Sequence, residues 1–297
     1  MEYVVAVLDI GKTNKKIALF DRRLNVLEVQ KRHIDTYRED DLDIEDVGRI
    51  EEWFISELRA AAKKYPIRAI SISTHGASVV CVDLGGERCV QKKAYMNEVD
   101  ESVHERFFRM FGTPESLQQE TATAHVKPLI NMGKLLFYVK ERFPDRFRRT
   151  RHVLFYPQYF GYRLTGVAAA DITYAGCHTF LWNPNQNDWS SVVDGLGIRE
   201  LLPRRLNRPT EPLGTITAEV ARETGLSEDT VVTTGIHDSN SSLIPYLISR
   251  DDDFVLNSTG SWCVAMHRME RIEFRPEELG KLVFYNLSYR GTPVKTS

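Results

Sequence analysis

The sequence predicts an α/β fold in which a mixed sheet is flanked by helices. Three short apolar strands, over residues 4–8, 15–20 and 26–29, follow one another across tight polar breaks and indicate a meander. A long amphipathic helix and another apolar strand come next. With 297 residues, 42% of them hydrophobic, the chain has enough apolar material for a sizeable core.

The helix and the strands after it are predicted from side-chain spacing. Apolar side chains recur at helical intervals at Ile50, Trp53, Phe54, Leu58 and Ala61. Pro66 ends this helix, and strands are expected over residues 67–72 and 79–82. Three strands, a helix, a strand and a further strand match the core of the ribonuclease H-like fold of actin-like ATPases. We therefore predict a mixed five-stranded sheet of this kind.

The sequence after residue 98 predicts a helical insertion, followed by a second series of strands like the one that opens the chain. Residues 98–202 are rich in helix-forming segments, such as 132–143, and are expected to shape a substrate pocket. A strand over 231–234 and a helix from Asp238 or Ser239 follow. Strands are then expected over residues 254–257, 262–266 and 282–287. We predict one domain over residues 1–248 and the start of a second, similar domain over 249–297.

Composition excludes several classes of function. Lys and Arg number 39 against 41 acidic residues, so the net charge of -2 gives no broad field for nucleic acid. The four cysteines form no CxxC pair, which argues against a disulfide framework or a zinc knuckle. No apolar run approaches the roughly 20 residues that span a bilayer. We expect a cytoplasmic protein with no membrane or nucleic-acid partner, and a homodimer is allowed.

A carboxylate and a small-residue turn follow the first strand. Asp9 ends a buried strand, and backbone amides of the turn after it can wrap phosphates while Asp9 holds Mg²⁺ through water. An ordinary β-turn with a solvated Asp explains this segment equally well. A Walker P-loop does not, because Ala6 stands where its first glycine belongs and a strand follows instead of a helix. The turn consists of Gly11, Lys12, Thr13, Asn14 and Lys15.

Two later segments have matching features. Asp238 follows an apolar strand and opens a helix, so its carboxylate is either a general base for a sugar hydroxyl or a helix cap. A second turn, with Thr259, Gly260 and Ser261, either clamps phosphates from the opposite side or is a plain hairpin. An Asp at each of two separate strand ends favours the catalytic interpretation.

Taken in order, these segments resemble the FGGY family of carbohydrate kinases. Residues 9–13 are similar to its first phosphate motif, 74–76 to its sugar-contacting turn, and 235–238 to the segment with the catalytic base. Residues 162–166, 171–175 and 258–262 resemble further stretches of the family pattern. The six matches extend over most of the chain and also lean toward the rhamnulose and fuculose kinase branch.

The resemblance implies a role for each matching residue. Asp238 would be the general base, and Asp9 with Asp238 would serve Mg²⁺. His75, Gly76, Asn97 and Asp238 would contact the sugar, although a structural imidazole explains His75 equally well. The sugar segment departs from the family pattern at Asn97 and Val99, where an Asp and an Arg are usual. The residues placed around the phosphates of ATP are Gly11, Lys12, Thr13, Asn14, Lys15, Thr259, Gly260 and Ser261.

The expected function is transfer of the γ-phosphate of ATP to a hydroxyl of a ketose-like sugar such as rhamnulose, fuculose or xylulose. The chain ends after the opening strands of the second domain, so we expect an incomplete form with weak sugar binding and poor turnover. Two alternatives stay open. One is an actin-like ATPase without a sugar acceptor, and the other is a sugar sensor that does not transfer phosphate.

Overall fold

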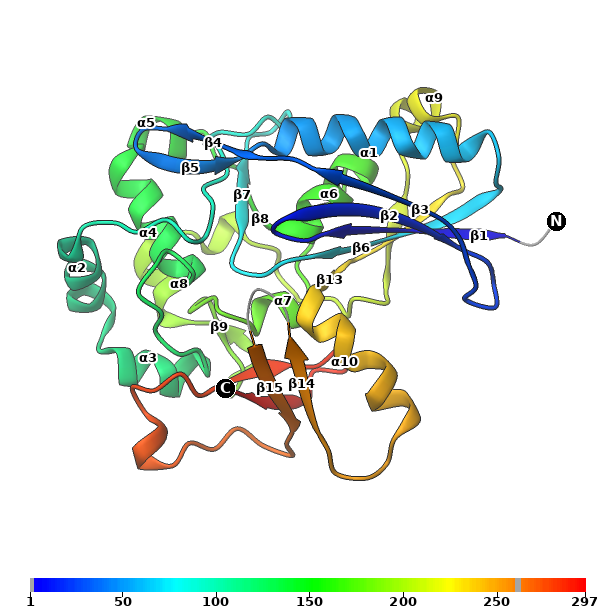
Figure 1. Ribbon diagram of the computed structural model, residues 1–297. Coiled ribbons are helices and arrows are strands. Elements are labelled where there is room, and N and C mark those ends of the chain that lie inside the picture. The colour runs from blue at the N-terminus through cyan, green and yellow to red at the C-terminus, as the bar shows by residue number, and fades with distance from the viewer. Residues whose placement is uncertain (1–2, 260–262) are drawn as a thin grey trace.

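The computed structural model of the chain describes residues 3–259 and 263–297. In this part, seven strands form the main sheet, in the order β11-β12-β6-β1-β2-β3, with β13 paired to the end of β6 (Figure 1). β1 runs antiparallel to β2 and parallel to β6, so the sheet is mixed, as predicted. The strands are β1 (Val4–Ile10), β2 (Asn14–Phe20), β3 (Val26–His33), β6 (Ile67–Thr74), β11 (Pro212–Thr215), β12 (Val231–Thr233) and β13 (Ile236–His237).

The prediction of a five-stranded sheet was wrong, because β7 leaves the main sheet and β11, β12 and β13 join it. β7 (Val79–Val82) forms where expected, but it pairs with β8 (His152–Phe155) in a separate ladder. The chain leaves the main sheet at Ala77, whose φ of 58° turns the backbone away. β11 joins the edge of the main sheet although its sequence contains a proline and a glycine. Such a short edge strand has no apolar pattern that would reveal it.

Helices α1 (Val47–Ala62), α6 (Tyr156–Thr165) and α9 (Ala218–Thr224) lie on one face of the main sheet (Figure 1). The side chain of Asp46 caps α1 by accepting a hydrogen bond from the backbone N–H of Arg49. Phe54 of α1 meets Phe160 of α6 edge to face, with ring centroids 5.7 Å apart. The predicted apolar stripe of α1 is therefore buried in the main core.

A short hairpin, β4 (Thr36–Glu39) and β5 (Leu42–Glu45), precedes α1 and was not predicted. Asp40 and Asp41 form its turn with φ values of 52° and 63°. Two positive φ values suit a tight hairpin turn, but the usual Asn-Gly or Asp-Gly pair is missing. The charged composition of β4 also conceals the hairpin, which brings Glu45 into the protein interior.

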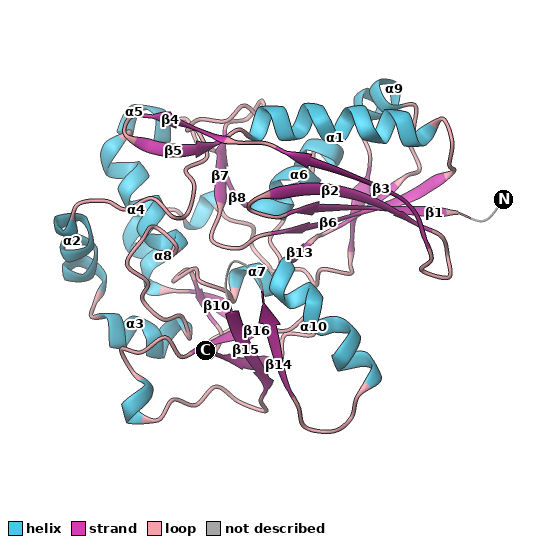
Figure 2. Ribbon diagram, in the orientation of Figure 1, coloured by secondary structure: helices cyan, strands magenta, loops and turns pink. Residues whose placement is uncertain are grey.

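The helical insertion gathers at one end of the main sheet (Figure 2). Its α4 (Met132–Arg142) matches the predicted helix and ends before Pro144. Phe107 packs with Phe111, Phe137 and Phe180 between these helices. The other elements are α2 (Glu101–Phe111), α3 (Pro114–Thr121), α5 (Pro144–Phe147), α7 (Ile172–Ala175), β9 (Trp182–Asn183), β10 (Asp188–Trp189), α8 (Ser191–Leu196) and the 3-10 helix η1 (Arg199–Leu201).

After α10 (Asp238–Ser249) the chain forms a separate antiparallel sheet, in the order β14-β15-β17-β16. It packs against α3, where the Gln118 amide donates to the carbonyl of Val283 at 2.6 Å. This sheet begins near the boundary expected at Ser249, and the division into two domains stays a prediction. Its elements are β14 (Val255–Thr259), β15 (Cys263–Arg268), the 3-10 helix η2 (Pro276–Glu278), β16 (Phe284–Leu287) and β17 (Pro293–Thr296).

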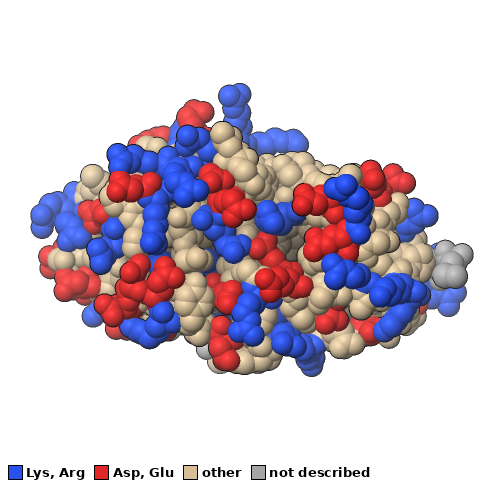
Figure 3. Space-filling model, turned by 90° about the horizontal axis from the view of Figure 1, so that it is seen from above, with Lys and Arg blue, Asp and Glu red and all other residues tan. Residues whose placement is uncertain are grey.

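The surface charges, the lengths of the helices and the state of the cysteines agree with the composition. Lys and Arg are interspersed with Asp and Glu over the face shown in Figure 3, without a broad field of one sign. Within the described ranges, no helix combines the length and apolarity needed to cross a bilayer. All four cysteines are free thiols, as their spacing predicted.

Candidate active site

The carboxyl ends of three parallel strands define the candidate site. β6 lies between β1 and β13, and Asp9 on β1 and Ile236 on β13 both pair with Ser73. Asp238 follows β13 directly. Asp9 and Asp238 therefore lie at the same sheet edge, the one formed by the carboxyl ends of the parallel strands, on either side of β6. Neighbouring strands are spaced by about 4.8 Å, which places β1 and β13 about 10 Å apart. The structure thus brings together two acids separated by most of the chain.

Asp9 is partly open to solvent. Its side chain is 34% exposed, and the Lys16 ammonium donates to Oδ2 at 2.9 Å. Oδ1 has no hydrogen-bond partner among the described residues. One carboxylate oxygen therefore remains available for water or a ligand.

The turn after β1 is fixed from below by Lys15. Its buried ammonium donates to the carbonyls of Gly11 at 3.0 Å and Lys12 at 2.9 Å. In a trans peptide the N–H points opposite to the C=O, so the amides of Lys12 and Thr13 face away from Lys15. Lys12, Thr13 and Asn14 are exposed on that outer side. The turn can present amides to an anion, whereas Lys15 itself supports the turn from the interior.

Glu45 is the centre of a buried ion cluster beneath this turn. Its carboxylate forms ion pairs with Lys15 at 3.3 Å and, at shorter range, with Lys92, and it lies 3.2 Å from Nε2 of His75. Burial by itself raises the pKa of Glu45, but Lys92 and His75 outweigh it and hold the pKa well below its usual range. The Lys92 ammonium also lies 4.6 Å from the centre of the Tyr156 ring. Glu45 thus links the first turn to the segment with His75.

His75 and Asn97, both predicted to contact sugar, are engaged by the protein. Nδ1 of His75 is 2.9 Å from the carbonyl of Gly76, and Nε2 faces Glu45, so both ring nitrogens have partners. The Asn97 amide donates to the carbonyls of Asp43 and Ala94, and its oxygen accepts from the N–H of Asp43. Asn97 therefore fastens β5 to its own loop. The structure places neither side chain on an open surface.

The side chain of Asp238 lies beside His237, and its Oδ1 accepts a hydrogen bond from the backbone N–H of Ser239 at 2.7 Å. Nδ1 of His237 accepts from the Asn240 amide at 3.1 Å, which places the ring proton on Nε2. Nε2 lies 3.3 Å from Oδ1 of Asp238. Burial lowers the pKa of His237, an effect that the Asp238 charge partly offsets, so the ring is a neutral donor. Asp238 is 39% exposed, and its Oδ2 has no partner within the described ranges.

Helix α7 joins the two halves of the site. The Thr173 hydroxyl accepts from the N–H of His237 at 3.2 Å, while the Tyr174 hydroxyl donates to the carbonyl of His75 at 2.9 Å. Asp171 caps α7 by accepting from the N–H of Tyr174, and burial raises the pKa of Asp171 to about 7. One short buried helix therefore fixes both the His75 turn and the junction before Asp238.

The second predicted phosphate turn is only partly described. Thr259 lies exposed at the end of β14. Gly260 and Ser261 lie outside the described residues. Their assignment to ATP stays a prediction.

The carboxylates of Asp9 and Asp238 at the sheet edge fit a magnesium ion whose other ligands are phosphates and waters. Mg²⁺ is usually held through one or two carboxylates together with phosphates and waters. Asp9 and Asp238 have partly exposed side chains, and each keeps one oxygen without a partner among the described residues. Within the described ranges, no group of three His, Cys, Asp or Glu residues could hold a metal by itself.

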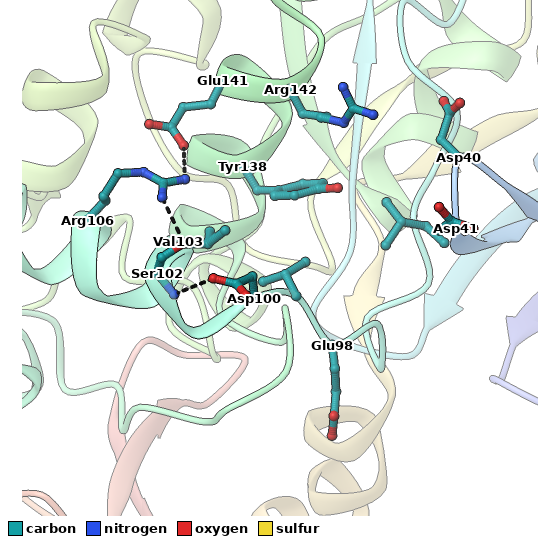
Figure 4. A pocket seen from close by; sticks show the side chains of 12 residues that line it. Asp40, Asp41, Glu98, Asp100, Ser102, Val103, Arg106, Tyr138, Glu141 and Arg142 are labelled. Carbon is teal, nitrogen blue, oxygen red and sulfur yellow. Dashed lines mark hydrogen bonds and ion pairs between the residues drawn. The ribbon is translucent and has the colours of Figure 1, made fainter.

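A hollow of about 510 Å³ lies elsewhere, between the β4–β5 turn, α2 and α4 (Figure 4). Five of its twelve lining residues are acidic, including Asp40, Asp41 and Asp100, and its Arg106 is paired with Glu141 at 3.0 Å. Neither Asp9 nor Asp238 lines this hollow. Its volume therefore says nothing about the candidate site.

The sequence profile of the FGGY family of carbohydrate kinases, N-terminal domain, matches residues 4–245. The chain belongs to this family. Among curated proteins, it is 24% identical to an L-fuculokinase of Salmonella typhi over 290 residues and 24% identical to a rhamnulokinase of Halalkalibacterium halodurans over 271 residues. These matches include 91% and 88% of the chain but 57% and 55% of the relatives, so the chain spans little more than half their length.

Solved structures confirm the actin-like fold of this FGGY chain. A carbohydrate kinase from Novosphingobium aromaticivorans superposes with a TM-score of 0.87 at 26% identity, over 100% of the chain and 62% of that protein. A ligand-bound xylulose kinase from Lactobacillus acidophilus gives a TM-score of 0.84 at 19% identity, over 99% of the chain and 59% of that protein. The predicted fold class is therefore confirmed.

Sequence reasoning did not find the side chains that position the FGGY site. His237 was visible beside Asp238, and a histidine before a strand-end acid is a signal that could have identified it. Glu45 gave no signal, because it ends a short charged hairpin. Lys92 lies in a loop, and only the tertiary structure pairs it with Glu45.

Proposed function

We propose that this chain is the sugar-binding part of an ATP-dependent carbohydrate kinase that phosphorylates a ketose-like sugar of the rhamnulose, fuculose or xylulose type. The observation that supports it most is the position of Asp9 and Asp238 at one sheet edge, flanking β6. Family membership and the fuculokinase and rhamnulokinase relatives agree with this choice of acceptor. The expected setting is the cytoplasm.

In the proposed reaction, the oxygen of the sugar hydroxyl attacks the γ-phosphorus of ATP, and ADP leaves. Oδ2 of Asp238 accepts the proton of that hydroxyl. Phosphoryl transfer has a loose transition state, so a carboxylate can orient the hydroxyl and take its proton late. The backbone N–H of Ser239 donates to Oδ1 at 2.7 Å, and His237 Nε2 lies 3.3 Å from the same oxygen, which leaves Oδ2 for the acceptor. A bound Mg²⁺ would neutralise charge on the phosphates near Asp9.

The phosphate groups are assigned to the outer side of the turn over residues 11–14 and, from the other side, to residues 259–261. His75 and Gly76 are assigned to the sugar side of the sheet edge, with Gly76 packed against His237. Asn97 would then act on the sugar through the loop that it fastens. We divide the chain into a sugar-binding domain over residues 1–248 and a second actin-like domain that begins at 249.

The test measures binding first, because it requires only the chain itself. Rhamnulose, fuculose, xylulose and a set of polyols are screened for a rise in melting temperature, which a ligand of the folded state causes by mass action. ADP release with ATP and Mg²⁺ is then measured with and without the best sugar. ATP hydrolysis that no sugar stimulates would favour the actin-like ATPase alternative. Sugar binding that survives Asp238→Ala without any turnover in the parent chain would favour the sensor.

A further inference from the structure

A second hollow, of about 460 Å³, lies away from the sheet edge. The β9–β10 hairpin, the loop over residues 204–208 and the β16–β17 hairpin enclose it. Figure 2 shows β10 beside β16 in this region. The hollow therefore joins a part of the chain before Ser249 to a part after it. Its volume is in the range of small-molecule sites.

Four arginines line this hollow without a carboxylate partner. Three of them come from the 204–208 loop, and the fourth lies at the tip of the β16–β17 hairpin on the other side. Among the described residues, Asp188 is the only acid in the lining, and Arg199 donates to its carboxylate at 2.9 Å and 3.2 Å. In the described part of the chain, no ion pair joins any of the four to an acid. The four are Arg204, Arg205, Arg208 and Arg290.

An unused buried donor lies in the same lining. Trp182 is 5% exposed, and its indole N–H is buried without a hydrogen-bond partner in the described part of the chain. The adjacent Trp189, whose ring centre is 5.3 Å away, donates its own N–H to the carbonyl of Pro203. Buried donors are usually satisfied, and for this one the described part of the protein supplies no acceptor.

These observations point to an anion. Guanidinium groups bind phosphate or carboxylate in a bidentate manner, and repulsion among four of them is relieved by a counter-charge between them. Because arginines of two separate segments line the hollow, one ligand with two anionic groups can contact both segments. Apolar side chains, including Ile172, Leu287 and Pro293, supply the rest of the lining.

We propose that this hollow binds a small polyanion of the diphosphate class, such as a doubly phosphorylated metabolite. The ligand bridges the 204–208 loop and the β16–β17 hairpin, and so ties the sheet after Ser249 to the insertion. Trp182 lines the site, so its fluorescence reports occupancy. The site is separate from the proposed transfer of phosphate at Asp238, and its existence does not depend on that reaction.

The test is isothermal titration of the chain with inorganic pyrophosphate, alongside Trp emission. Arg205→Ser and Arg290→Ser remove one charge from each side, and each is expected to weaken binding at least about tenfold, the effect of one lost charge-assisted contact. Arg222→Ser is the matched control, because this exposed arginine of α9 also forms no ion pair with any residue that the structure describes. It should change the dissociation constant less than about twofold, since distant exposed charges are screened.

A second control separates this hollow from the phosphate turn. Lys12→Ala alters the turn after β1, and it should leave pyrophosphate binding at the arginine hollow unchanged. Three results would overturn the proposal: no heat with the parent chain, equal weakening by Arg222→Ser, or loss of binding only with Lys12→Ala. Circular dichroism of each variant confirms that the exposed substitutions keep the fold.

Discussion

Replacing Glu45 by Gln tests the buried ion cluster directly. The substitution keeps the shape of the side chain but removes the negative charge that faces Lys15, Lys92 and His75. Two ammonium groups are then left buried without a counter-ion. Breaking a buried pair in this way costs about 3–5 kcal/mol. We expect the free energy of unfolding to fall by that amount, a large part of a total that is commonly about 5–15 kcal/mol.

The measurement is urea unfolding followed by tryptophan fluorescence. Glu39→Gln is the control, because Glu39 lies on the same hairpin and its 3.7 Å pair with Arg146 is partly exposed, with side chains 33% and 51% exposed. Exposed pairs contribute about 0–1 kcal/mol. A loss below about 1 kcal/mol for Glu45→Gln, equal to that of the control, would refute the role of the cluster. If Glu45→Gln does not fold, adding Lys92→Met should restore folding by removing one stranded charge.

The same cluster predicts a pH dependence with a definite sign. The pKa of Glu45 in the folded protein lies well below its ordinary 4.5, because Lys92 and His75 outweigh the opposing effect of burial. Its contribution is therefore fully present above the unfolded pKa and is lost as pH falls through the folded pKa. The stability difference between the parent chain and Glu45→Gln should be constant above about pH 5 and shrink below it. A difference that grows on acidification would contradict this assignment.

Three further predictions concern the site and the thiols. Asp238→Asn should lower sugar-dependent phosphoryl transfer by about 10²- to 10⁴-fold in kcat while the melting temperature is retained, because its side chain is 39% exposed. An unchanged kcat would remove Asp238 from the reaction. Gly76→Ala places a Cβ 2.7 Å from Nε2 of His237 and should destabilise the fold by about 1–3 kcal/mol, whereas Gly85→Ala meets its nearest atom at 3.5 Å and should be tolerated. Urea unfolding compares the two. A thiol reagent should modify Cys263 quickly and the three buried thiols only after unfolding, and fast reaction of a second thiol would contradict the burial.

Much of the fold followed from local patterns in the sequence. The meander of β1 to β3 and helix α1 were predicted because their apolar spacing matches strand and helix periods. Asp9 and Asp238 stood out because each follows an apolar strand. Local chemistry is sufficient where the hydrophobic period is strong and a strand end is marked by an acid.

The sequence by itself determined the fold class, the family resemblance and the two strand-end acids of this protein. Only the tertiary structure decided that Lys15 faces inward, that β7 leaves the main sheet, and that Glu45 gathers two lysines and a histidine. These outcomes depend on which residues distant in the sequence come into contact in the fold. They also depend on the high free-energy cost of an unpaired charge in a low-dielectric interior. Neither the long-range contacts nor this cost can be read from the hydrophobic periodicity of a single segment.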